Sequence, residues 1–123
     1  MAFNAITTGE QSVTTTGAIT GTLDTSAYTK DFWSAKLRIT SFPAGQTATI
    51  VLEDTANVTP FSDAKTVAVA HITGPATAEA PIDFVWKKFD IPNARFGATN
   101  TKLRYNVTQI SGGTLKAIGF LEP

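Results

Sequence analysis

The chain has 123 residues, of which 42% are hydrophobic and only 16% are charged, and its ten basic residues balance ten acidic ones. This length suits one domain with a packed core. The balanced charge argues against a nucleic-acid partner, which needs a positive field, and the absence of cysteine excludes disulfides and thiolate metal sites.

The first thirty residues are rich in threonine and glycine, as in "TTGEQSVTTTGAITGTLDTSAYT". Threonine is β-branched and favours extended backbone. Two interpretations stay open: an edge strand followed by a loop, or an extended arm that lies on a neighbouring subunit. We expect residues 1–30 to form this arm and the first strands, and residues 31–123 to form the core of the same single domain.

A period of two begins after the arm. In "FWSAKLRITSF", Trp33, Ala35, Leu37 and Ile39 alternate with polar residues, which is typical of a half-buried strand. "QTATIVLED" alternates in the same way after the turn Pro43-Ala44-Gly45, so the two segments predict a β-hairpin.

Four more segments have strand character: "KTVAVAHI", "IDFVWKKFDI", "KLRYNVTQI" and "TLKAIGFLE". The last two are separated by Ser111-Gly112-Gly113, which predicts a second hairpin. No segment has a helical period over the length of a helix. About eight short strands therefore predict an all-β fold, an antiparallel β-sandwich of jelly-roll-like form.

Few residues suggest catalysis or metal binding. His71 is the only histidine, and a histidine on a strand face is more common than a catalytic one. Glu53, Asp54 and Asp63 flank one loop and carry calcium-type oxygen ligands, but their spacing does not fit a calcium loop, so a solvated loop end is the better interpretation. We expect no enzyme activity, no cofactor and no metal.

Aromatic residues offer a choice between core packing and sugar binding. The candidates for a sugar-stacking platform are Phe32, Trp33, Phe84, Trp86 and Phe89. Their place in alternating strands favours core packing for most of them. The segment "DFVWKKF" nevertheless has an aromatic residue on both faces, which indicates an interface.

Three stretches together resemble small bacteriophage structural proteins: "GTLDTSAYTKDFWSAKLRITSFPAGQTATIVLEDTAN", "KKFDIPNARFGATNTKLRYNVTQISGG" and the final "FLEP". They are similar to head decoration (cement) proteins and related virion β-sandwich proteins. The resemblance implies a jelly-roll-like homotrimer on the outer capsid surface, with the major capsid protein as its partner and no catalytic residues. No secretory signal and no membrane-length apolar run is visible, so we expect synthesis in the host cytoplasm and no membrane partner.

The expected function is that of a capsid decoration protein that braces adjoining capsid subunits. The alternative is a carbohydrate-binding β-sandwich of a phage tail or surface protein. The expected partner-interface residues belong to the arm and to one later loop; they are Thr14, Thr15, Thr16, Ile19, Thr22, Arg95 and Phe96.

Overall fold

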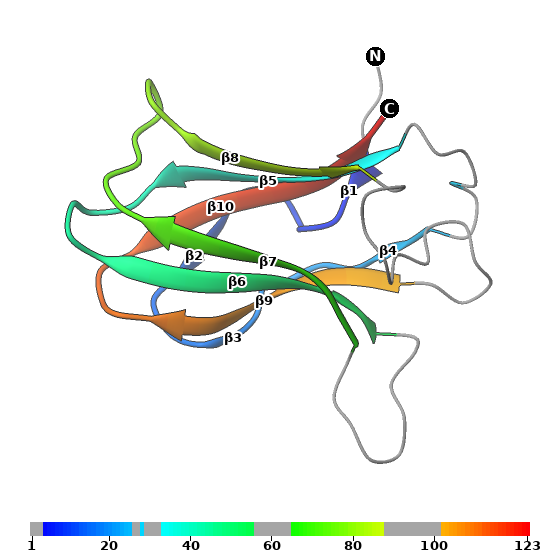
Figure 1. The fold of residues 1–123 in the computed structure, drawn as a ribbon, viewed down its shortest axis with the longest axis horizontal. Coiled ribbons are helices and arrows are strands. Elements are labelled where there is room, and N and C mark those ends of the chain that lie inside the picture. The colour runs from blue at the N-terminus through cyan, green and yellow to red at the C-terminus, as the bar shows by residue number, and fades with distance from the viewer. Residues whose placement is uncertain (1–3, 26–27, 29–32, 56–64, 88–101) are drawn as a thin grey trace.

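The computed structural model describes residues 4–25, 28, 33–55, 65–87 and 102–123 (Figure 1). These residues form ten strands and two antiparallel sheets, which confirms the all-β sandwich. The strands are β1 (Asn4–Ala5), β2 (Gln11–Val13), β3 (Gly17–Ala18), β4 (Leu23–Asp24), β5 (Ser34–Ser41), β6 (Thr47–Asp54), β7 (Lys65–Thr73), β8 (Ile82–Lys87), β9 (Lys102–Ile110) and β10 (Leu115–Glu122).

The strand order is that of a jelly roll. In sheet A, β10 lies between β5 and the short strands β1 and β2, and β8 follows β5. In sheet B, β9 lies between β6 and the short strands β3 and β4, and β7 follows β6. The ten strands therefore fill eight positions, because two pairs of short strands each share one position. The long strands β5, β7, β8 and β9 are each followed by a strand of the opposite sheet, as in double-sheet Greek-key folds.

Both hairpins predicted from the sequence are wrong. β5 and β6 lie in different sheets, and so do β9 and β10, so each turn is an arch between the sheets. The arches pack together, since a Cβ on Gly113 would lie 2.8 Å from Pro43 Cγ. Alternation shows only which residues of a strand face inward. Two strands packed face to face across a core show the same alternation as two strands hydrogen-bonded in one sheet, so the pattern does not show which strands pair.

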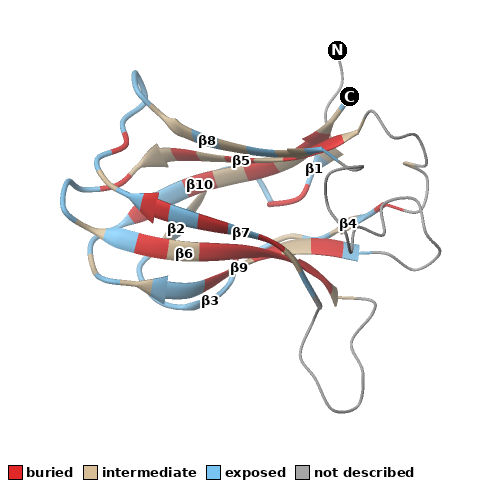
Figure 2. Cartoon of the chain, viewed as in Figure 1, coloured by how far each residue is buried: buried red, intermediate tan, exposed pale blue. Residues whose placement is uncertain are grey.

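The core lies between the sheets and consists of the inward residues of the long strands. Leu37, Ile39, Ile50 and Leu52 are each 0% exposed. Figure 2 shows buried bands alternating with less buried ones along β5 and β10, whereas the second half of β6 is buried throughout. The alternation predicted for "KLRYNVTQI" is confirmed, with three buried residues separated by more exposed ones.

The N-terminal segment closes one side of the sandwich. It pairs first with β10 and then with β9, so it supplies the edge strands of both sheets. Ile6 and Thr7 both donate their backbone N–H to the Gly119 carbonyl, and Ile19 donates to the Tyr105 carbonyl. The edge-strand interpretation of this segment is therefore confirmed for residues 4–25 of the isolated chain. The described residues contain no helix with the length and hydrophobicity needed to cross a bilayer.

Candidate interaction surfaces

The other side of the sandwich is bordered by β7 and β8. Each pairs with a single strand among the described ones, β7 with β6 and β8 with β5. These two strands also carry the large hydrophobic side chains that are most exposed in the described part of the chain, Val69 at 46% and Val85 at 50%. An edge strand presents unpaired N–H and C=O groups, so a further strand could add to either sheet here.

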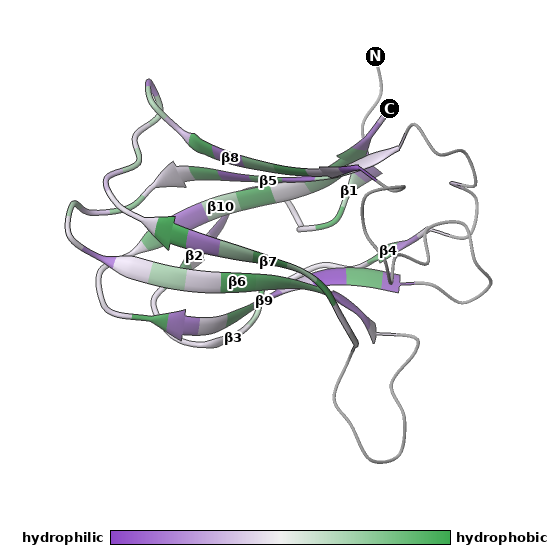
Figure 3. Ribbon diagram, viewed as in Figure 1, coloured by the Kyte–Doolittle hydropathy of each residue, from purple (hydrophilic) through white to green (hydrophobic). Residues whose placement is uncertain are grey.

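The β7 edge is long and carries few charges. From Thr66 to Thr73 its only titratable side chain is His71, and hydrophobic colours dominate the strand in Figure 3. Natural sheet edges are usually protected by lysine, proline or short length, and these eight residues have none of these. Val69 lies opposite Val51 of β6, so two valines meet on the outer face of sheet B beside this edge.

The β8 edge is shorter and amphipathic. Its outward residues Asp83, Val85 and Lys87 are exposed, whereas Phe84 and Trp86 are partly buried against the core. Arg38 donates from Nε and Nη2 to the two carboxylate oxygens of Asp83, at 2.8 and 2.9 Å. This hydrogen-bonded ion pair holds the pKa of Asp83 below its usual range.

The aromatic rings of β8 stack on one another rather than forming an open platform. The Phe84 and Trp86 rings have centroids 5.9 Å apart at an interplanar angle of 12°. Trp86 also packs 6.3 Å from Tyr105, which is fully buried. Trp33 meets Tyr28 edge to face at 4.6 Å. Phe32 and Phe89, the remaining candidates for sugar stacking, lie outside the described residues.

The predicted interface residues of the arm fall into two groups. The threonines are exposed at the surface: Thr14, Thr15, Thr16 and Thr22. Ile19 is only 3% exposed and belongs to the core, so its side chain is not presented to a partner in the isolated chain. Arg95 and Phe96, the other predicted interface residues, lie outside the described part of the chain.

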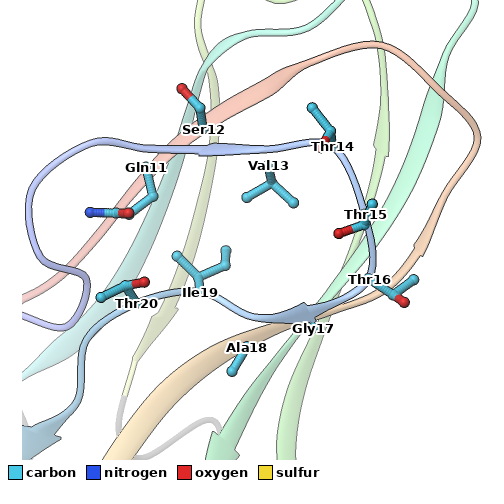
Figure 4. Close-up of a pocket in the computed structure, with 10 residues that line it drawn as sticks. All are labelled: Gln11, Ser12, Val13, Thr14, Thr15, Thr16, Gly17, Ala18, Ile19 and Thr20. Atoms are coloured by element: carbon cyan, nitrogen blue, oxygen red, sulfur yellow. The ribbon is translucent and has the colours of Figure 1, made fainter.

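The loop between β2 and β3 encloses a hollow of about 190 Å³ (Figure 4). Residues 11–20 line it, and Val13 and Ile19 point into it from opposite sides of the loop. The remaining lining residues are Gln11, Ser12, Gly17, Ala18 and four threonines. A second hollow, of about 310 Å³, lies where Glu10 and Lys116 meet the loop after β7. In this hollow Thr40 donates its hydroxyl to the Glu10 carboxylate at 2.6 Å.

The acidic residues near the β6 end are buried, so the expected solvated loop end is wrong. Glu53 is 5% exposed, and it accepts hydrogen bonds from Arg104 Nε at 2.9 Å and from Asn106 Nδ2 at 3.1 Å. Asp54 is 0% exposed and accepts from the Lys102 backbone N–H. Buried carboxylates need such partners, so these two acids stabilise the end of sheet B. Asp63 lies outside the described residues.

His71 is exposed on the outer face of sheet B, where its Nδ1 lies 3.4 Å from Thr49 Oγ1. No group of three histidine, aspartate or glutamate side chains lies close enough to hold a metal ion among the residues that the structure describes.

The fold defines a jelly-roll β-sandwich whose clearest surface features are its β7 and β8 edges. No protein-family model and no curated protein matches the chain.

Proposed function

We propose that the protein is a structural virion protein, a capsid decoration protein that binds the outer shell and stabilises it across capsid-subunit boundaries. The resemblance of residues 21–123 to decoration proteins supports this proposal, and so does the jelly-roll architecture. The observation that carries it is the β7 edge, which combines an open strand with an exposed valine. In this proposal the major capsid protein is the partner, and the capsid surface is the place of action.

The β7 edge suits a protein partner better than a small ligand. Strand addition takes its affinity from backbone hydrogen bonds and its specificity from alternate side chains. Val69, which is 46% exposed, offers an apolar contact to an added strand. Multivalent attachment over a shell would give a high overall affinity even if each contact of this kind is weak. The exposed threonines at residues 14–16 form a second surface on the opposite side of the sandwich.

The experiment is co-sedimentation with empty shells assembled from the major capsid protein of the virus that carries this gene. We expect the wild-type chain to pellet with the shells and to saturate at a fixed ratio to capsid subunits. Val69→Asp places a carboxylate at the β7 edge, and we expect it to lose this binding. Val85→Asp is a matched control, because Val85 has a similar exposure on the other edge strand, and we expect it still to pellet.

Two outcomes would count against the proposal. If no variant pellets, the capsid role is wrong. If Thr15→Asp abolishes binding while Val69→Asp does not, the threonine loop is the capsid surface and the β7 assignment is wrong. The homotrimer that the resemblance implies is a separate question, which the solution mass decides.

The carbohydrate-binding alternative has less support. Sugar stacking needs aromatic faces open on one surface, whereas Phe84 and Trp86 stack on each other and Trp86 packs on Tyr105. A glycan array that shows saturable binding, with tryptophan fluorescence responding to the same sugar, would favour this alternative over the capsid role.

A further inference from the structure

The β8 edge is self-complementary. Its sequence from Asp83 to Lys87 reads "DFVWK", with valine at the centre, aromatic residues on either side of it, and opposite charges at the two ends. We propose that β8 pairs with β8 of a second copy of this chain, antiparallel, about a two-fold axis at Val85. The proposal does not depend on the capsid role.

The register follows from the symmetry. In an antiparallel pair about a two-fold axis at Val85, that residue lies opposite its own copy in the second chain. Each Phe84 then lies opposite a Trp86, and each Asp83 opposite a Lys87. A C2 contact uses the same surface on both chains. Two copies of one strand therefore pair well only if the antiparallel register places no like charges opposite each other.

The outer face of sheet A gains an apolar contact and two ion pairs. Val85 is 50% exposed in the single chain, and its two copies would meet with Cβ atoms roughly 5 Å apart, as directly opposed residues do. Asp83 already accepts two bonds from Arg38, and the Lys87 ammonium of the second copy would join that ion pair from the open side. Lys87 is exposed and faces outward like Asp83.

The inner face gains aromatic packing. Phe84 and Trp86 pack against the core but are only partly buried in the single chain, because β8 has a described neighbour on one side only. A second β8 would cover their open side and place the ring of Phe84 opposite that of Trp86. Aromatic cross-strand pairs stabilise antiparallel strands.

The β7 edge fits self-pairing less well, although it is longer. An antiparallel pair about Val69 would place Val67 opposite His71 and would form no ion pair. The charge pattern therefore favours β8 as the contact between copies. The zero formal net charge of the chain adds no general repulsion between two copies.

The first test is the solution mass, measured by light scattering coupled to size exclusion. The chain mass is 13.0 kDa, and we expect twice that mass for the wild type at high concentration, falling toward one chain on dilution. We expect Val85→Asp to have the mass of one chain at every concentration, because it places two carboxylates opposite each other on the axis. Val69→Asp, on the other edge strand, should leave the two-chain mass unchanged.

A charge exchange makes the test specific to the register. Lys87→Asp places Asp83 opposite an aspartate, and Asp83→Lys places Lys87 opposite a lysine, so each variant alone should have the mass of one chain. An equimolar mixture should form a heterodimer, because every opposed pair then has opposite charges. Circular dichroism and the thermal midpoint of each variant check that it is folded.

The chain has no cysteine, so a single introduced one gives a clean readout. Under mild oxidation Val85→Cys should form a covalent dimer within minutes, whereas Val69→Cys should form no covalent dimer. A wild-type mass of one chain, or of three chains, overturns the proposal, because a two-fold contact cannot close a trimer. It is also overturned if the mixed charge variants stay monomeric while both are folded.

Discussion

Gly119 is a core position where one added methyl group should destabilise the fold strongly, because it would meet a buried aromatic ring. It lies on β10 and faces the ring of Tyr105, which is 0% exposed on β9 of the opposite sheet. A Cβ at this position would lie 2.3 Å from Tyr105 Cε2 and 2.6 Å from Cδ2. Carbon atoms in contact normally lie about 3.5–4.0 Å apart, so the ring or the strand would have to move by roughly 1 Å.

The expected cost follows from this overlap. Extra atoms in a packed core destabilise by about 1–3 kcal/mol, and we expect Gly119→Ala to lie near the upper end, since the ring is fully enclosed. The thermal midpoint should fall by roughly 10 °C, at about 4 °C per kcal/mol for a domain of this size. Urea unfolding monitored by far-UV circular dichroism measures the free energy directly.

A matched variant and a double mutant separate the clash from other effects. Gly112→Ala should change stability by less than about 0.5 kcal/mol, because its nearest neighbour is the flexible end of the Gln46 side chain at 3.1 Å. Tyr105→Leu should partly rescue Gly119→Ala, so that the double mutant is more stable than the sum of the two single changes predicts. A Gly119→Ala protein as stable as the wild type, or strict additivity, would refute the reasoning.

Three further predictions concern the polar groups of the core and of sheet A. The Thr7 hydroxyl accepts the Gly119 N–H at 3.0 Å in a buried site, so Thr7→Val should cost about 1–3 kcal/mol in urea unfolding, whereas exposed Thr16→Val should cost almost nothing. The buried Tyr105 hydroxyl has no hydrogen-bond partner among the described residues, so Tyr105→Phe should leave stability unchanged or raise it; a loss above about 1 kcal/mol would contradict this account. Because Arg38 lowers the pKa of Asp83, the ion pair stabilises the fold above about pH 4, and this stabilisation is lost as the pH falls through the lowered pKa. The pair is largely exposed, so Arg38→Gln should lower the unfolding free energy at pH 7 by only about 0.2–1 kcal/mol, and the two proteins should converge once the pH falls below the lowered pKa of Asp83.

The sequence predicts the faces of the long strands well, because inward and outward residues differ sharply in hydrophobicity. Leu37 and Ile39 are buried as expected, and so is Tyr105. The partners of the strands were not predictable in the same way. The turns at Pro43–Gly45 and Ser111–Gly113 have hairpin-like sequences, yet both connect facing sheets. Turn composition indicates a reversal of the chain and leaves open which sheet the next strand joins.

The candidate surfaces were only partly predictable. The exposure of the arm threonines could be expected from their polarity, but the burial of Ile19 follows from an edge pairing that a threonine-rich segment does not reveal. The interface predicted for "DFVWKKF" rested on its two-sided hydrophobicity, whereas the edge position of its described residues 83–87 came from the fold. The β7 edge was missed, because an open edge depends on which strand lies beside it.

Hydrogen–deuterium exchange on the chain, free and bound to empty shells, tests most directly the claim that the protein acts through its open sheet edges. In the free chain we expect fast exchange for the β7 amides that point away from β6. On shells these amides, within residues 65–73, should gain protection, while residues 14–16 should not change. Protection confined to the threonine loop, or no change at β7 in a chain that is demonstrably shell-bound, would contradict the account.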